Sequence, residues 1–176
     1  MTHALEQDQR FTLEATDLWA RKLAGVRRWS LDVAACKQSH LAARYYTARE
    51  NALVRAWRAR AVWCNPPYSD IGPWLWRAWD AMRRLEAGTV ALLLPATRTE
   101  QPWWQEHVEP WRDRGPRIFG GWPVWLTSHF PAGRTRFGNP KDPRGQYVGS
   151  PDFTCVLLVF RRQPLTVQAS GLRSAA

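Results

Sequence analysis

The sequence predicts a parallel α/β sheet with helices on both of its faces. Short apolar runs that suit buried strands alternate along the chain with segments of helical periodicity. Apolar residue types make up 45% of the chain and charged types 23%, which is the composition of a globular protein. A chain of 176 residues is long enough for one ordinary domain and too short for two. We therefore expect one folded domain over residues 1–163 and a disordered polar tail over 164–176.

A helix at residues 16–23 opens the predicted fold, with Thr16 or Asp17 as its N-cap and Gly25 as its stop. The apolar run SLDVAA at 30–35 predicts a short buried strand that ends near its single acidic residue.

The chain between this strand and the next has weaker signals. We expect a short helix at 39–44, a strand at 45–47 and a helical or irregular segment at 53–60. The run AVWC at 61–64 predicts a strand, and this strand stops at NPPYSD because two prolines cannot continue a hydrogen-bonded ladder.

A longer helix is predicted to start near Pro73 and to stop at Gly88. Its apolar residues recur at helical spacing, and its charged residues, Arg77 and Asp80 among them, fall on the other side. The remaining predicted elements are a strand at 89–94, a helix at 100–112, a strand at 117–119, a long loop at 120–150 and a strand at 153–160.

The charge of the chain indicates a polyanionic partner. Lys and Arg number 25 against 15 Asp and Glu, which gives a net charge of +10 and suits nucleic acid. The apolar runs ALLLPA and CVLLVF are too short to span a bilayer, and the first ten residues lack the apolar core of a signal peptide. We therefore expect no membrane partner.

Three widely spaced cysteines, Cys36, Cys64 and Cys155, exclude a fully paired disulfide framework and suit a reducing, cytoplasmic compartment. Cys36 and His40 have ligand-like spacing, but no second ligand pair follows them, so we expect no metal site.

The most specific motif is Asn65-Pro66-Pro67-Tyr68, which follows a predicted strand and precedes a helix. The prolines stiffen the turn and remove backbone donors, so the turn offers carbonyl acceptors beside the side-chain oxygen of Asn65. Two acceptors can hold both hydrogens of one amino group and so localise the lone pair on its nitrogen. Tyr68 offers a face on which a planar base can stack. A stiff turn without a catalytic role is the alternative.

Asp32 also lies at the end of a predicted strand. In parallel sheets ligands bind beyond the carboxyl ends of the strands, so Asp32 and the NPPY turn can line one crevice. The alternative is that the carboxylate only caps the following turn.

A basic segment late in the chain is the candidate DNA contact, because its cations are interleaved with aromatic residues and glycines. A solvated loop in a generally basic protein is the alternative. The candidate side chains are Arg114, Arg117, Arg134, Arg136, Lys141 and Arg144.

The run LDVAA…YYT…NAL…VWCNPPYSDI, followed by ALLLPATRT…WW and RIF, resembles the phage-type DNA N6-adenine methyltransferases (the Dam family) over residues 11–160. The resemblance implies a single-domain, Rossmann-like methyltransferase sheet that uses S-adenosylmethionine as its methyl donor. It also implies that the NPPY residues hold an adenine flipped out of double-stranded DNA. Protection of phage DNA from host restriction is the biological role that it suggests.

The cofactor residues that the resemblance implies are Asp32 and the residues at three further family positions. Asn51 stands where the family usually has an Asp that contacts the cofactor's adenine, and Glu50 can compensate for the lost charge. Thr12 occupies the family's Thr-Pro position without the Pro, and Ala34 and its neighbour replace the glycine-rich loop of many methyltransferases.

The leading interpretation is a monomeric, site-specific DNA adenine N6-methyltransferase. The same motif can serve a methyltransferase that acts on RNA or on a protein glutamine. A non-catalytic DNA-binding descendant of a methyltransferase is the alternative from another class, and it would not bind the methyl donor.

Overall fold

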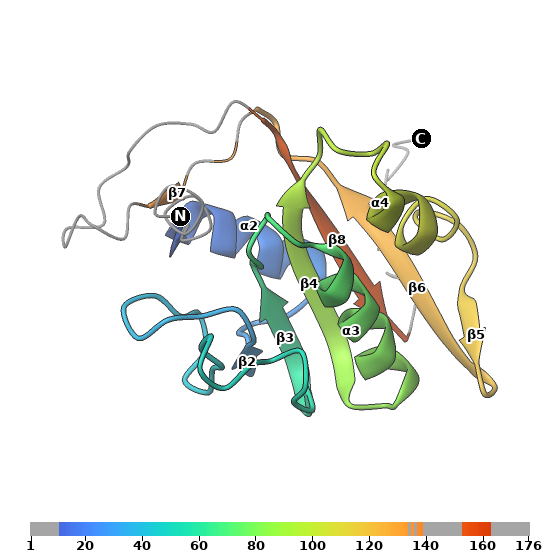
Figure 1. Cartoon of the computed structure of the whole chain (residues 1–176), viewed down its shortest axis with the longest axis horizontal. Helices are drawn as coiled ribbons and strands as arrows, with labels where there is room; N and C mark the ends of the chain where they lie inside the picture. Colours follow the sequence, from blue (N-terminus) through green and yellow to red (C-terminus); the bar gives the residue numbers. More distant parts are fainter. Residues whose placement is uncertain (1–10, 134, 136, 139–152, 163–176) are drawn as a thin grey trace, which may run out of the picture.

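A computed structural model describes residues 11–133, 135, 137–138 and 153–162. Its centre is a six-stranded sheet with strand order β2-β3-β4-β8-β6-β5 (Figure 1). The strands are β2 (Leu31–Asp32), β3 (Ala59–Cys64), β4 (Ala87–Pro95), β5 (Arg117–Phe119), β6 (Trp122–His129) and β8 (Cys155–Arg161).

The sheet is mixed, not parallel throughout. β2, β3 and β4 run parallel, whereas β8 is antiparallel to both β4 and β6, and β5 is antiparallel to β6. The prediction of a parallel sheet is therefore correct for one half and wrong for the other. β5 and β6 are antiparallel because a short turn joins them, and β8 enters between β4 and β6 in the opposite direction to both.

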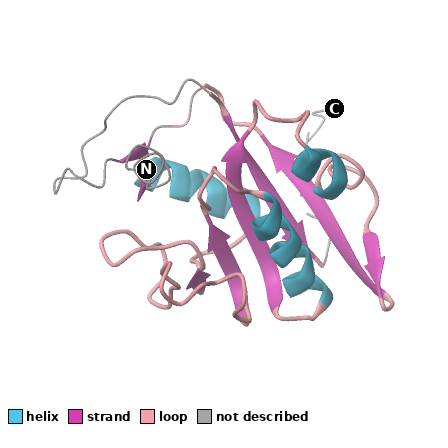
Figure 2. Ribbon diagram, viewed as in Figure 1, coloured by secondary structure: helices cyan, strands magenta, loops and turns pink. Residues whose placement is uncertain are grey.

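Helices cover both faces of the sheet, which confirms the predicted α/β class. Helix α2 (Glu14–Ala24) lies behind the sheet against β4 and β8, and α3 (Gly72–Arg83) and α4 (Pro102–His107) lie on the near side (Figures 1 and 2). A second, two-stranded sheet pairs β1 (Phe11–Thr12) with β7 (Phe137–Gly138).

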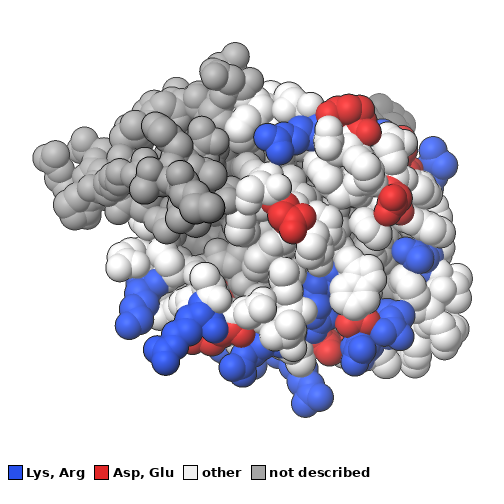
Figure 3. Space-filling model, viewed as in Figure 1, with Lys and Arg blue, Asp and Glu red and all other residues white. Residues whose placement is uncertain are grey.

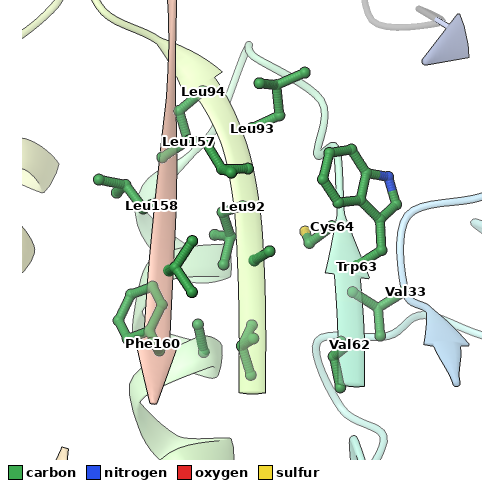
Figure 4. Close-up of a cluster of buried hydrophobic side chains, with 14 of the residues drawn as sticks. Val33, Val62, Trp63, Cys64, Leu92, Leu93, Leu94, Leu157, Leu158 and Phe160 are labelled. Carbon is green, nitrogen blue, oxygen red and sulfur yellow. The ribbon is translucent and has the colours of Figure 1, made fainter. Parts of the chain in front are cut away.

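The core lies along the central strands. Residues 90–94 of β4 and 156–160 of β8 are fully buried, as expected for strands covered on both faces. Figure 4 shows the leucines of β4 beside those of β8, with Val62, Trp63 and Cys64 of β3 on the other side. Burial of this continuous apolar layer is the main stabilising contribution to the fold.

Several predicted boundaries are confirmed and others are wrong. Gly25 ends α2 in a left-handed conformation (φ +60°), but the helix starts at Glu14 with Leu13 as its N-cap, so Thr16 and Asp17 lie inside it. Helix α3 starts next to Pro73 as predicted, and β5 has the predicted bounds. Helix α4 ends at His107, five residues earlier than expected.

The largest error concerns residues 120–150, because the expected loop contains the eight-residue strand β6 and the two-residue strand β7. No helix forms at 39–44, and the expected strand at 45–47 contributes only an isolated bridge between Tyr45 and Asp32.

Gly88 does not stop α3 but lies inside β4. A Cβ there would stand 2.7 Å from the carbonyl oxygen of Arg60, so glycine is required for β3 and β4 to approach. The predicted tail at 164–176 lies outside the described residues.

Candidate active site

The NPPY turn lies where the sequence places it, between the carboxyl end of β3 and the start of α3. Beside it a cavity of about 760 Å³ opens at the carboxyl ends of β2 and β3. Six of the predicted site residues line this cavity together with apolar side chains such as Val33, Leu41 and Trp63. They are Thr12, Asp32, Ala34, Asn51, Asn65 and Pro67.

The side-chain amide of Asn65 is held at both ends. Its Nδ2 donates a hydrogen bond to Oγ1 of Thr12 at 3.4 Å, and its Oδ1 accepts one from the hydroxyl of Tyr68 at 3.0 Å. Thr12 comes from β1, so a strand remote in sequence orients the amide of the catalytic candidate. The structure thus gives Thr12 a contact with the NPPY turn in addition to its place in the cavity wall.

Tyr68 is almost enclosed, with 8% of its surface exposed. Its ring packs edge-on against Phe137 of β7 (6.4 Å between centroids) and against Phe153 (5.8 Å). Its carbonyl oxygen accepts a hydrogen bond from the guanidinium of Arg98 at 3.2 Å. Sequence reasoning did not assign these three partners to the site, because they come from segments far apart along the chain.

Asp32 combines both of the interpretations that the sequence left open. Its Oδ1 accepts a hydrogen bond from the backbone N–H of Ala34 (3.2 Å) and its Oδ2 one from Leu41 (2.9 Å), so the carboxylate caps the turn that follows β2. The same side chain lines the cavity and is only 4% exposed. Burial raises the pKa of Asp32 from 3.8 to about 6, and the two backbone N–H groups oppose this rise. The group is therefore mostly ionised at neutral pH.

Asn51 adopts a left-handed backbone conformation, with φ of +50°. Asn and Asp tolerate this region better than other residues with a side chain, because their short polar groups bond locally. Here Oδ1 of Asn51 accepts a hydrogen bond from the backbone N–H of Leu53 at 3.3 Å. The amide therefore supports its own turn while it lines the cavity.

Glu50 does not line the cavity. Its carboxylate accepts hydrogen bonds from the backbone N–H of Thr47 (2.8 Å) and from the Thr47 hydroxyl, and these bonds lower the pKa of Glu50. It borders a separate groove on the other side of the same turn. Cys36 also lines the cavity, a position that its place in the sequence did not predict.

The predicted DNA-contacting side chains fall far from this site or outside the described residues. Arg117 belongs to β5, the last strand on the side of the sheet away from β2, and its guanidinium lies over the rings of Trp111 (4.6 Å), Phe119 (4.8 Å) and Trp79 (5.2 Å). Burial there lowers the pKa of Arg117. Arg114 is exposed in the preceding turn. Arg134, Arg136, Lys141 and Arg144 lie outside the described residues.

Among the described residues, no cluster of three or more His, Cys, Asp or Glu side chains could hold a metal ion. Within the same part of the chain, every helix is too short or too polar to cross a membrane.

A family model described as DNA N-6-adenine-methyltransferase (Dam) matches residues 11–113, which is more than half of the chain. No curated protein matches the sequence. Among solved structures, the chain is similar to a proposed RNA methyltransferase, PH1948 from Pyrococcus horikoshii. The two are 14% identical with a TM-score of 0.42, over 86% of this chain and 70% of that chain.

Proposed function

The chain belongs to the DNA N-6-adenine-methyltransferase (Dam) family, and from this premise we propose that it transfers a methyl group from S-adenosylmethionine to the exocyclic amine of an adenine flipped out of double-stranded DNA. The observation that carries the proposal is the position of Asn65, which lines the cavity at the end of β3 with its amide fixed by Thr12 and Tyr68.

The cavity suits the methyl donor in size and in chemistry. Its volume of about 760 Å³ lies within the usual range for cofactor sites. Apolar side chains such as Trp63, Ala52 and Leu53 offer a surface for the planar base of a nucleoside. Asp32 offers a buried carboxylate, and a carboxylate has lone pairs beyond the two that its backbone partners occupy. When bound, the donor supplies an electrophilic methyl group on a positively charged sulfur.

Asn65 and the backbone carbonyls of the turn would act on the adenine amine. This amine is a weak nucleophile because its lone pair is delocalised into the ring. Two acceptors that hold its two hydrogens favour a tetrahedral nitrogen, whose lone pair then points away from the turn. Because Pro66 and Pro67 restrict the turn, the acceptors need no reorganisation as positive charge develops on the nitrogen.

The test is methyl transfer by the purified chain and by the Asn65→Ala variant. Each protein is incubated with S-adenosylmethionine and with DNA that lacks adenine methylation, and N6-methyladenine is measured by mass spectrometry after digestion to nucleosides. Gln105→Ala, which removes an exposed amide on α4, is the matched control. We expect product from the parent and the control, and a loss of at least 100-fold in the Asn65 variant, in line with the loss of one oxyanion-type contact.

Each negative result points to a different alternative. A protein that binds S-adenosylmethionine but leaves DNA unmodified would refute the substrate, and RNA and protein glutamine would be assayed next. A protein that does not bind S-adenosylmethionine would be the non-catalytic descendant that the sequence left open.

A further inference from the structure

The connection between β2 and β3 is unusual for two neighbouring parallel strands. Such strands are normally joined through a helix, but residues 33–58 contain no helix and no strand. Irregular connections longer than about 15 residues are uncommon in compact domains, and those that occur are mostly functional. The segment 33–58 is long enough to need such an explanation.

The segment is held in place by buried side chains instead of by secondary structure. Trp57 is fully buried, and its indole N–H donates a hydrogen bond to the carbonyl of Ala52 at 2.9 Å. The guanidinium of Arg77, only 4% exposed, lies 5.2 Å from the Trp57 ring. It also donates two hydrogen bonds to the carbonyl of Arg55, at 2.7 and 3.1 Å. These contacts fix the backbone of the segment against α3.

The charge of the segment is strongly one-sided. Between residues 37 and 60 there are six basic residues and one acidic residue, Glu50, so the net charge is 6 − 1 = +5, half of the +10 of the whole chain. The six cations are exposed, and none makes a salt bridge within 4 Å to another described residue. They are Lys37, Arg44, Arg49, Arg55, Arg58 and Arg60. Figure 3 shows Lys and Arg side chains gathered along the lower left edge of the molecule, where Figure 1 draws this connection.

Three of these arginines surround a groove, which we call the arginine groove. It has a volume of about 570 Å³ and is bordered by Arg44, Arg55, Arg58 and Tyr46. The side chain of Arg44 donates to the carbonyl of Arg58, and Nε of Arg55 donates to the carbonyl of Glu50 at 3.1 Å. A guanidinium has five N–H donors, so Arg44 and Arg55 keep donors for a ligand although these bonds position their side chains.

The arginine groove and the candidate active-site cavity share a wall. The turn 47–56 contributes Thr47, Arg49 and Asn51 to the cavity and Glu50, Val54 and Arg55 to the groove. Lys37 and Arg49 line the cavity, so the positively charged surface extends to the cavity itself. A duplex that presents one base to the cavity extends for several base pairs on either side, and its phosphates must meet protein surface near the cavity.

We propose that the arginine groove and the exposed cations of residues 37–60 bind the phosphate backbone of the duplex that flanks the target base. The proposal rests on the proposed function for its choice of double-stranded DNA as the polyanion. This surface replaces Arg117 as the main candidate DNA contact among the described residues. The guanidinium of Arg117 is packed over three aromatic rings at the opposite side of the sheet.

The experiment measures how binding of a fluorescent 30-base-pair duplex depends on salt, by anisotropy and without the methyl donor. The variant replaces Arg44, Arg55 and Arg58 by Gln. The control replaces Lys22, Arg83 and Arg84 by Gln and so removes the same charge from other exposed positions. Each phosphate contact contributes about 0.9 to the slope of log K against log salt. We therefore expect the slope to fall by about 2.7 in the groove variant and to change by less than 0.9 in the control.

A second variant guards against misfolding of the triple variant. Arg58→Gln changes one exposed side chain and should lower the slope by about 0.9. An unchanged slope in both groove variants, or an equal fall in the control, would overturn the proposal. A fall in the slope that is seen with a duplex RNA of the same length but not with the DNA would also overturn it. The experiment measures binding and not methyl transfer. If the slope is unchanged in the groove variants but the protein methylates DNA, only the proposal about the arginine groove is refuted. If the slope falls in the groove variants but the protein does not methylate adenine, only the proposed methyl transfer is refuted.

Discussion

Asp32 provides a quantitative test of how the candidate site is built. Its pKa of about 6 lies roughly 2 pH units above the value of 3.8 for a solvated aspartate, because the carboxyl is buried. One pH unit corresponds to about 1.4 kcal/mol, so the native state binds the Asp32 proton more tightly than the unfolded state by roughly 3 kcal/mol. This stabilisation is fully present below pH 4 and is lost as the pH rises through 6.

The perturbation is Asp32→Asn, which removes the titration and keeps the size of the side chain. Its amide oxygen can accept from one of the two backbone N–H groups, while its NH₂ faces the other, at a cost of about 1–3 kcal/mol that does not depend on pH. The assay is urea unfolding of both proteins between pH 3.5 and 7.5. Other carboxylates titrate in both proteins, so the difference in unfolding free energy isolates Asp32.

We expect the stability of the parent relative to the variant to fall by roughly 3 kcal/mol between pH 4 and pH 7. The same substitution at the exposed Asp70 is the control for loss of a carboxylate. A parent–variant difference that stays constant within about 1 kcal/mol over this range would refute the argument that burial controls the ionisation of Asp32.

The same ionisation predicts a pH dependence of cofactor binding. S-adenosylmethionine carries positive charge, and an ionised Asp32 in the cavity wall attracts it more strongly than the protonated acid. Affinity measured by calorimetry should therefore increase between pH 5 and pH 7 in the parent and vary much less in Asp32→Asn. Equal pH profiles for the two proteins would show that the carboxyl only caps its turn.

Three further predictions concern the frame of the site. Gly88→Ala should destabilise the fold by about 1–3 kcal/mol in chemical unfolding, because its methyl group meets a backbone carbonyl of β3, whereas Gly115→Ala, with open space around it, should have little effect. Arg77→Met should cost about 3–5 kcal/mol of unfolding free energy, because it removes the buried guanidinium that pairs with Glu86 at 2.5 Å and donates to the carbonyl of Arg55, and a loss no larger than that of the exposed Arg83→Gln would contradict this role. Asn51→Asp should bind S-adenosylmethionine about 5-fold more tightly in calorimetry, since Asp also tolerates the left-handed backbone and adds a negative charge; weaker binding would count against Asn51 as a cofactor residue.

The elements around the catalytic candidate could be predicted because their signals are local. Two prolines end β3, Pro73 starts α3, and the apolar run of β4 needs no partner to be recognised as a buried strand. Strand β6 was missed because its signals are mixed. It follows two glycines that form the hairpin turn, contains Pro123 and ends in polar residues that are half-buried in the sheet.

The contacts that complete the site depend on tertiary structure. Arg77 has the helical spacing of a solvent-facing residue, yet it is buried because it reaches the carbonyl of Arg55, 22 residues earlier in the chain. Leu41, whose N–H bonds Asp32, follows it by nine residues through an irregular loop, and no periodicity encodes that distance. The arginine groove was missed for a related reason: its cations are spread along a segment whose expected helix and strand do not form.

The contacts of Asn65 bear directly on the proposed chemistry. An asparagine amide presents an acceptor on one side and two donors on the other, and only the acceptor can hold an amine. Thr12 takes up the donor side, and Oδ1 accepts the hydrogen bond from the hydroxyl of Tyr68. Thr12 pairs with Phe137 across the small sheet, and Phe137 packs on Tyr68. Thr12, Phe137, Tyr68 and Asn65 therefore form one closed set of contacts. The two-stranded sheet accordingly fixes the orientation of the Asn65 amide, on which the proposed chemistry depends.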